Sequence, residues 1–198
     1  LSSRTRTMSK ITIIGVGQIG SHAGVALRNE GALKVIDFDQ VEQKNVLSQA
    51  HGKMALRRNK AQSFAQMMQG MFGLKVDAIP HKLTEDNVGQ LLGGSDLILD
   101  CTDNIAARLL IQGYAKANDI PCLHGALAAT GDFARIVWTE HFKADAESVE
   151  GEATCEDGAT LPFGQVTAAN LAVIVQRFLK DGTKVSCQIS PTSYVRLA

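Results

Sequence analysis

The sequence predicts an α/β fold in which helices cover both faces of a mostly parallel β-sheet. Three observations support this prediction. Short apolar runs rich in β-branched residues alternate along the chain with segments of helical periodicity. The run at residues 11–14 ends in a glycine-rich turn that leads into a helical segment. The chain has 198 residues, which is enough for one domain with its own core.

In the first half of the chain, the expected strands and helices alternate. Residues 11–14 form a β-branched run typical of a buried strand, and Gly31 lies where a C-terminal cap of the first helix is expected. Apolar residues at helical spacing predict a helix from residue 60 onward. The expected strands are residues 11–14, 33–38, 74–79 and 96–101, and the expected helices are residues 21–29, a segment from residue 60, a short segment opened by Thr84, and residues 104–118.

Beyond residue 118, the acidic stretch at residues 140–158 lacks periodicity and is expected to be a mobile loop. The other elements expected there are strands at residues 121–124 and 134–138, a helix at residues 164–180, and two short strands between residues 184 and 197. Residues 1–7 resemble a cloning tail, so Met8 is expected to be the native start. The whole pattern predicts a single Rossmann-like domain.

Composition argues against several classes of function. Lys and Arg together number 20, as do Asp and Glu, so the chain lacks the basic excess of a nucleic-acid-binding surface. No apolar run approaches the roughly 20 residues that span a bilayer. The four cysteines include no C-x-x-C pair, which argues against a zinc site. We expect a reducing, cytoplasmic setting with no nucleic-acid or membrane partner, and we expect the five histidines to lie on the surface or in loops.

A G-x-G-x-x-G hexamer lies between the first expected strand and the first expected helix. In such a loop the first glycine makes a tight turn, the second lets a phosphate approach the backbone, and the third allows close helix–strand packing. Asp37, at the end of the second strand, is placed to accept a hydrogen bond from a ribose hydroxyl. On these features alone NAD is the default ligand. The loop residues expected to contact the nucleotide are Gly15, Gly17, Gln18, Ile19 and Gly20.

Further motifs favour a different nucleotide. Asp37-Phe38-Asp39-Gln40-Val41-Glu42 continues to Asn45, and Lys60 opens the next helix. The fourth strand runs into Asp100-Cys101-Thr102-Asp103-Asn104, and Arg108 follows one turn into the helix. In order and spacing these motifs resemble those of the ThiF/MoeB/HesA family, the bacterial relatives of ubiquitin-activating enzymes. The resemblance runs from Ile11 to about Trp138 and continues more loosely through the helix at residues 164–180.

The resemblance implies an adenylyltransferase that uses ATP and Mg²⁺. Such enzymes attach AMP to the C-terminal glycine carboxylate of a small ubiquitin-fold or sulfur-carrier protein, and the resemblance also implies a homodimer. Catalysis would depend on positioning and on positive charge. The resemblance assigns a phosphate-binding charge to Lys60, the Mg²⁺ ion to Asp103, and a thiol that receives the activated protein to Cys155. It implies further nucleotide contacts from Asp37, Asp39, Asn45, Lys60, Asp103 and Arg108.

Some of these residues also have plainer interpretations. Lys60 could be a solvated residue at a helix start, and Asp103 could be the N-cap of the helix that follows it. Exposed arginines such as Arg108 are common on helices. The acidic residues around Cys155 tend to raise the pKa of its thiol and slow its attack. The cysteines expected to be small buried hydrophobes on core strands are Cys101 and Cys122.

The chain also departs from the family pattern. Ser48 stands three residues after Asn45, where the family has an arginine, and the longer N-terminal helix that supplies another family arginine is not expected here. The paired zinc cysteines of the family are absent too. Arg57 or Arg58 could replace the lost charge. Two other functions therefore stay open, namely a nucleotide-binding module that has lost adenylation and an NAD-dependent oxidoreductase.

Overall fold

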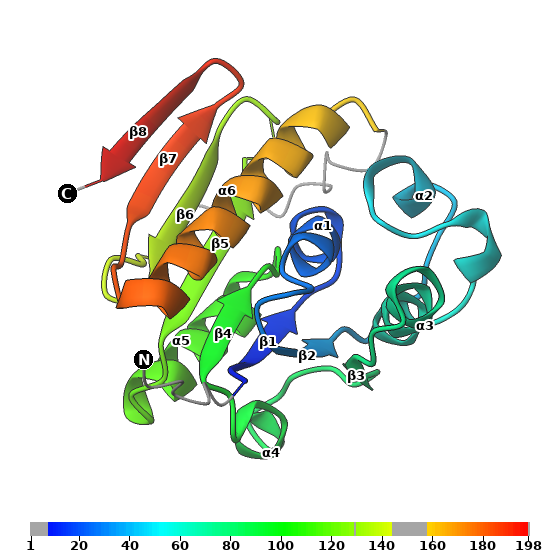
Figure 1. Cartoon of the computed structure of the whole chain (residues 1–198), viewed down its shortest axis with the longest axis horizontal. Coiled ribbons are helices and arrows are strands. Elements are labelled where there is room, and N and C mark those ends of the chain that lie inside the picture. Colours follow the sequence, from blue (N-terminus) through cyan, green and yellow to red (C-terminus); the bar gives the residue numbers. More distant parts are fainter. Residues whose placement is uncertain (1–7, 129, 144–157, 198) are drawn as a thin grey trace, which may run out of the picture.

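The structure, a computed structural model, describes residues 8–128, 130–143 and 158–197. Within these residues it contains an eight-stranded sheet with the strand order β3-β2-β1-β4-β5-β6-β7-β8 (Figure 1). The strands are β1 (Lys10–Ile14), β2 (Ala32–Ile36), β3 (Asp77–Ile79), β4 (Leu97–Asp100), β5 (Cys122–Leu127), β6 (Ala134–Trp138), β7 (Ser186–Ser190) and β8 (Ser193–Leu197). Strands β1 to β5 pair in parallel, and β6 to β8 are added antiparallel. The predicted mostly parallel α/β sheet is confirmed.

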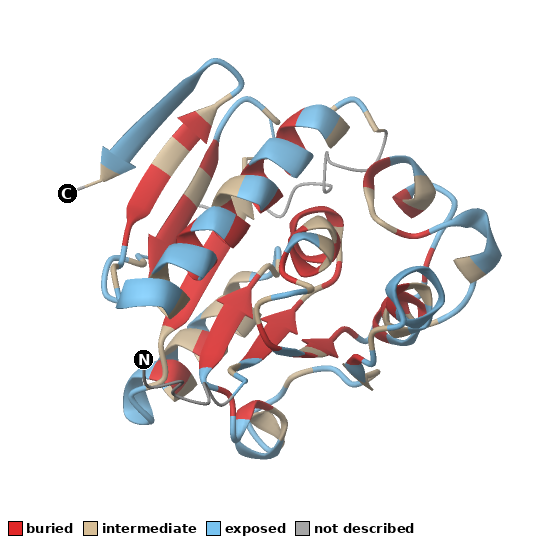
Figure 2. Cartoon of the chain, in the orientation of Figure 1, coloured by how far each residue is buried: buried red, intermediate tan, exposed pale blue. Residues whose placement is uncertain are grey.

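Helices cover both faces of this sheet, as predicted. They are α1 (Gln18–Ala26), α2 (Asn45–Ser48), the 3-10 turn η1 (Lys53–Ala55), α3 (Lys60–Phe72), α4 (Val88–Leu92), α5 (Ile105–Ala117) and α6 (Leu161–Asp181). One hydrophobic cluster joins Ile13 of β1 to α1, α3 and α6, and the other joins its neighbour Ile14 to α4 and α5. Because successive side chains of a strand point to opposite faces, the sheet separates these two cores. Figure 2 shows the central strands buried beneath the exposed outer faces of the helices.

Two helices begin at other residues than predicted, and one expected helix cap has another role. Helix α1 starts three residues earlier than expected, because the glycine loop leads directly into it with Gly17 at the N-cap. Gly31 does not cap this helix; a Cβ on Gly31 would lie 2.2 Å from the carbonyl oxygen of Ser9, so the glycine allows two chain segments to approach. Residues 84–87 form a turn, and α4 begins after it at Val88.

Helix α6 crosses the sheet beside α1 (Figure 1) and is ended by Gly182, whose φ is +75°. No helix in the described part of the chain is both long and apolar enough to cross a membrane. Cys155 and most of the loop expected at residues 140–158 lie outside the described residues, as do residues 1–7.

Candidate functional site

Packing requires the first and third glycines of the loop but not the second. A Cβ on Gly15, whose φ is +82°, would lie 2.9 Å from the carbonyl oxygen of Cys101, and a Cβ on Gly20 would lie 1.9 Å from the carbonyl oxygen of Gly15. At Gly17 the nearest described atom to a Cβ would be the side-chain nitrogen of Gln49, at 3.8 Å. A side chain at the second glycine would therefore make only ordinary contacts, so packing within the protein does not explain a glycine at this position, whereas the close approach of a phosphate to the backbone would.

Asp37 connects the glycine loop to the end of β2. It is buried, and its Oδ2 accepts a hydrogen bond from the backbone N–H of Val16 at 2.8 Å, while Oδ1 accepts one from the backbone N–H of Asp39 at 2.9 Å. Burial raises the pKa of Asp37, although the charge of Lys60 and the two N–H groups act in the opposite direction. The carboxylate therefore holds the loop in place, a function additional to the ribose contact predicted for it.

Lys60 and Asp39 form an ion pair at the start of α3. Lys60 is buried, and its Nζ lies 3.0 Å from Oδ2 of Asp39. Asn59 caps the helix by accepting a hydrogen bond from the backbone N–H of Gln62, and its amide donates to the carbonyl oxygens of Asp37 and Asp39. Because the Asp39 side chain is about half exposed, the ion pair adds little stability. Because Lys60 itself is buried, its ammonium would need another anionic partner in order to leave Asp39.

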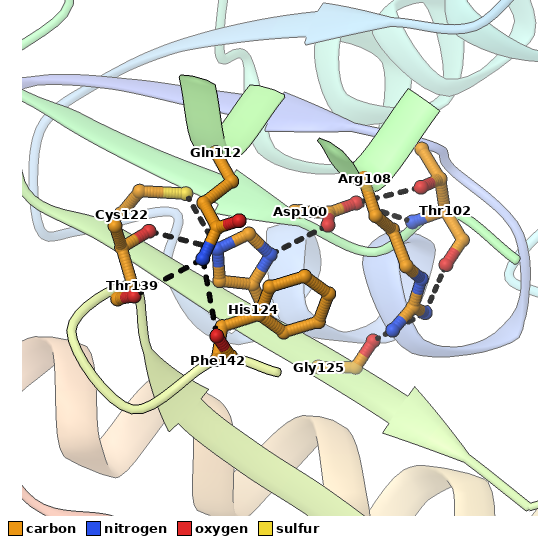
Figure 3. Close-up of polar contacts among 9 residues, drawn as sticks. All are labelled: Asp100, Thr102, Arg108, Gln112, Cys122, His124, Gly125, Thr139 and Phe142. Atoms are coloured by element: carbon orange, nitrogen blue, oxygen red, sulfur yellow. Dashed lines mark hydrogen bonds and ion pairs between the residues drawn. The ribbon is translucent and has the colours of Figure 1, made fainter. Parts of the chain in front are cut away.

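Asp103 lies in the loop between β4 and α5, and its side chain is exposed. The N-cap of α5 is Asn104, whose side chain accepts a hydrogen bond from a backbone N–H in the first turn. The interpretation of Asp103 as this cap is therefore wrong. Nη2 of Arg108 donates to the carbonyl oxygens of Thr102 and Gly125 (Figure 3), so Arg108 ties the loop that carries Asp103 to β5.

Three other predicted contact residues have structural partners. The side chain of Gln18 donates to Oγ1 of Thr160 at 3.3 Å, and Ile19 is part of the hydrophobic core beneath α6. Asn45 is buried, and its Oδ1 accepts a hydrogen bond from a backbone N–H just before α2. At the start of α1, the atoms of Gln18 and Ile19 that suit a phosphate are therefore their backbone N–H groups.

Buried polar atoms without a partner lie beside the glycine loop. Among the described residues, Ser48 Oγ, Gln49 Oε1 and His51 Nδ1 are buried and have no hydrogen-bond partner. The segment that carries them lies against the loop, since Nε2 of His51 is 2.9 Å from the carbonyl oxygen of Val16. Buried polar groups in proteins are almost always paired, with protein atoms, water or a ligand. Ser48 Oγ can donate or accept a hydrogen bond, whereas Gln49 Oε1 and, with the hydrogen on Nε2, His51 Nδ1 can only accept one.

A buried cluster beneath the Asp103 loop was not predicted. Nδ1 of His124 donates to Oδ2 of Asp100 at 2.7 Å, and Nε2 lies 2.8 Å from Oγ1 of Thr139 (Figure 3). Oδ1 of Asp100 accepts hydrogen bonds from the backbone N–H and the hydroxyl of Thr102. Burial acts to raise the pKa of Asp100, but the hydrogen bond from His124 and the charge of Arg108 outweigh it and hold that pKa below its usual value.

The prediction that all five histidines lie on the surface or in loops is wrong. His124 contradicts it, because it is on β5 and almost fully buried, whereas His51 lies in a loop but is buried beside the glycine loop. A signal for the burial of His124 was present in the sequence, because it lies inside the apolar run at residues 121–128. His51 follows no such pattern, and its position depends on tertiary packing.

The two cysteines expected on core strands both have thiols whose pKa is raised by burial. Cys122 is buried on β5, as predicted, and burial raises the pKa of its thiol. Cys101 follows β4 and is partly buried rather than lying on the strand, and burial likewise raises its thiol pKa. Neither thiol is a candidate nucleophile.

Sequence comparison relates this chain to adenylyltransferases. The ThiF family model matches residues 4–189. A SAMP-activating enzyme E1 of Haloferax volcanii is 30% identical over 123 residues, which cover 60% of this chain and 46% of that protein. A molybdopterin-synthase adenylyltransferase of Haemophilus influenzae is 29% identical over 122 residues, which cover 60% of this chain and 50% of that protein. The chain spans about half the length of these curated relatives.

Solved structures share the fold at low sequence identity. The crystal structure of Escherichia coli MccB with ATP superposes with a TM-score of 0.80 at 16% identity, over 96% of this chain and 64% of that one. At this identity the likeness concerns the fold alone. The family match, in contrast, extends over nearly the whole chain and includes every motif from Gly15 to Arg108. The chain therefore belongs to the ThiF family.

Proposed function

We propose that this protein is an ATP-dependent adenylyltransferase whose nucleotide lies over the glycine loop. The observation that carries the proposal is the glycine loop, in which Gly17 caps the start of α1 although packing within the protein does not require a glycine there. Phosphate oxygens would accept hydrogen bonds from the Ser48 hydroxyl and from backbone N–H groups at the N-terminus of α1, which favours an anion at this point. Asp37 stands at the end of the next strand, where a ribose is expected.

In the proposed reaction, an oxygen of a C-terminal carboxylate attacks the α-phosphorus of ATP. The bond between that phosphorus and the oxygen that bridges to the β-phosphate breaks, so the products are an acyl adenylate and pyrophosphate. Negative charge increases on the phosphate oxygens and on the departing pyrophosphate. The backbone N–H groups of the first turn of α1 and the ammonium of Lys60, once released from Asp39, would stabilise that charge.

Asp103 is the proposed ligand of Mg²⁺. Its carboxylate is exposed and follows a parallel strand whose end packs against Gly15, and carboxylate oxygen suits a hard cation. The described residues contain no group of three or more His, Cys, Asp or Glu side chains that could hold a metal ion. Asp103 would therefore share the ion with phosphate oxygens and water, as Mg²⁺ sites commonly do. When bound, the ion would supply positive charge to the phosphates.

The proposed acceptor is the C-terminal glycine carboxylate of a small ubiquitin-fold or sulfur-carrier protein, and the proposed assembly is a homodimer. The names of the relatives, which activate SAMP or act on molybdopterin synthase, support this class of acceptor. Cys155 is proposed as a thiol that receives the activated protein. A Cys155→Ser variant that still forms the adenylate but no longer forms a thioester would support that step, and unchanged thioester formation would exclude it.

Nucleotide-dependent unfolding and pyrophosphate exchange test the function. At a hundredfold excess over Kd, a ligand stabilises the folded state by about 2.7 kcal/mol, which raises the Tm of a chain of this size by roughly 5–11 °C. We expect this shift with ATP and Mg²⁺ and no comparable shift with NAD. Exchange of labelled pyrophosphate into ATP should require an acceptor with an intact C-terminal glycine. A larger shift with NAD or NADP would refute the proposal.

A nucleotide-binding module that has lost adenylation is the second candidate, and the arginine side chains favour it. Ser48 is fully buried at the position where the family has an arginine. Arg58 donates to Gln66 along α3 instead of reaching the glycine loop, and Arg57 is exposed. This function predicts ATP binding with no pyrophosphate exchange for any acceptor.

A further inference from the structure

One side chain beside the glycine loop combines a fixed position with an unused nitrogen. His51 is 4% exposed, and its Nε2 lies 2.9 Å from the carbonyl oxygen of Val16. Because a carbonyl oxygen only accepts hydrogen bonds, Nε2 must carry the hydrogen. Nδ1, on the other edge of the ring, is buried and has no partner among the described residues. The imidazole is therefore hydrogen-bonded to the loop through Nε2, while Nδ1 has no hydrogen-bond partner among the described residues.

The other cationic side chains around the loop already have partners. Lys60 pairs with Asp39, and Arg108 donates to two backbone carbonyl oxygens. Nε2 of His22, on α1, lies 3.2 Å from the carbonyl oxygen of Ser48. Of the three unpaired side chains in the segment from Ser48 to His51, the histidine alone can carry a positive charge.

We propose that His51 binds the phosphate groups of the nucleotide through Nδ1 and takes up a proton as the nucleotide binds. This inference rests on the proposed function and deepens it, because it names the side chain that supplies positive charge where position 48 holds a serine. His51 is hydrogen-bonded to the loop that is expected to bind phosphate. Its ring is held there by Val16 before any ligand arrives, so little side-chain freedom is lost on binding.

The surroundings of His51 keep its ring neutral until an anion is present. Burial lowers the pKa of His51, the hydrogen bond to Val16 partly opposes this, and the charges of Lys60 and His22 lower it further. Asp37 is an acidic group bonded to the same loop residue, because its Oδ2 accepts a hydrogen bond from the N–H of Val16. A phosphate against Nδ1 would place negative charge beside the ring and reverse the balance in favour of the imidazolium.

Calorimetric titration of the whole chain with Mg²⁺-ATP at pH 7.5, in two buffers of different ionisation enthalpy, measures the protons taken up. For the wild-type protein we expect uptake of a fraction of a proton, up to about one, per nucleotide. His51→Gln cannot gain a charge and should abolish this uptake and weaken Mg²⁺-ATP binding at least about tenfold. His22→Gln is the matched control, since His22 also approaches a backbone carbonyl oxygen, and it should keep the wild-type uptake.

Adenosine, which has no phosphate, separates phosphate binding from other contacts. Wild-type and His51→Gln proteins should bind adenosine equally, and a selective loss of adenosine binding would overturn the proposal. If His51→Gln unfolds, the imidazole NMR signals of the wild-type protein decide instead, because the pKa of one histidine should rise when Mg²⁺-ATP is added. Mg²⁺-ATP binding that is unchanged in His51→Gln refutes the role of His51 alone. No Mg²⁺-ATP binding by the wild-type protein refutes the proposed function itself.

Discussion

The second glycine of the loop offers a test that separates folding from ligand binding. In a Gly17→Ala variant the new methyl group meets no described atom closer than 3.8 Å, but the φ of −75° and ψ of −148° at this residue lie outside the regions that alanine favours. That conformation costs alanine about 1–3 kcal/mol, which exceeds the roughly 0.4–1 kcal/mol gained because the loss of a glycine stiffens the unfolded chain. We therefore expect a loss of stability of up to about 3 kcal/mol. The methyl group would occupy the space into which a phosphate must come, so Mg²⁺-ATP binding should fall by at least about tenfold.

Gly20→Ala is the matched variant from the same loop. Its methyl group would lie 1.9 Å from the carbonyl oxygen of Gly15, so α1 and β1 must move apart and the variant should lose stability beyond about 3 kcal/mol. Urea unfolding followed by the fluorescence of the single tryptophan, Trp138, measures both variants, and calorimetry measures their Mg²⁺-ATP affinity. The reasoning is refuted if Gly17→Ala binds Mg²⁺-ATP as tightly as the wild type does.

Four other outcomes are expected. Asp100→Ala removes the acceptor of His124 Nδ1 and of two Thr102 donors, so it should cost about 3–5 kcal/mol in urea unfolding, whereas the exposed Asp96→Ala control should cost under about 1 kcal/mol. Asp103→Ala should leave the Tm within about 2 °C of wild type and abolish Mg²⁺-dependent pyrophosphate exchange; retained exchange would place the metal ligand elsewhere. Asp37→Ala leaves two buried N–H groups without their acceptor, so both the unfolding free energy and ATP affinity should fall by about 1.5–3 kcal/mol, and a loss of affinity alone would contradict its anchoring function. Burial lowers the pKa of His51 and of His22 below 6.5, so the folded protein binds fewer protons than the unfolded chain at and below that pH. The free energy of unfolding should therefore be constant above pH 6.5 and fall as the pH drops from 6.5 toward the pKa values of the folded state. A urea midpoint that rises between pH 7.5 and 6 would contradict this.

The parallel half of the sheet could be predicted because its signals are local. The β-branched run at residues 11–14 and the helical spacing after Lys60 both appear in the structure as β1 and α3. The antiparallel arrangement of β5 and β6 was not predicted, although residues 128–133 are too few for the crossover that a parallel pair needs. The length of the connection between β5 and β6 therefore indicates an antiparallel pair, which the strand patterns alone do not.

The candidate site could be predicted in position but not in connectivity. Spacing placed Asp37, Lys60 and Asp103 after their strands or at a helix start, where the structure has them. Their partners depend on tertiary register. Asp100 contacts His124 because the parallel pairing of β4 and β5 places these two residues opposite each other, which no local pattern specifies. For the same reason, the packing of His51 against Val16 was not foreseen.

The glycine loop is bordered by buried polar groups whose burial the hydrogen bonds of the protein do not fully compensate. The carboxylate of Asp37 is buried, and this burial raises its pKa even though two hydrogen bonds and the charge of Lys60 favour the ionised form. Three side-chain atoms in the segment from Ser48 to His51 are buried without partners, and each such atom costs about 1–3 kcal/mol. A core chosen for stability would replace these groups with apolar ones. Their presence beside the glycine loop is explained if a polar ligand completes their hydrogen bonds, and the same argument requires that ligand binding stabilise this part of the chain more than any other.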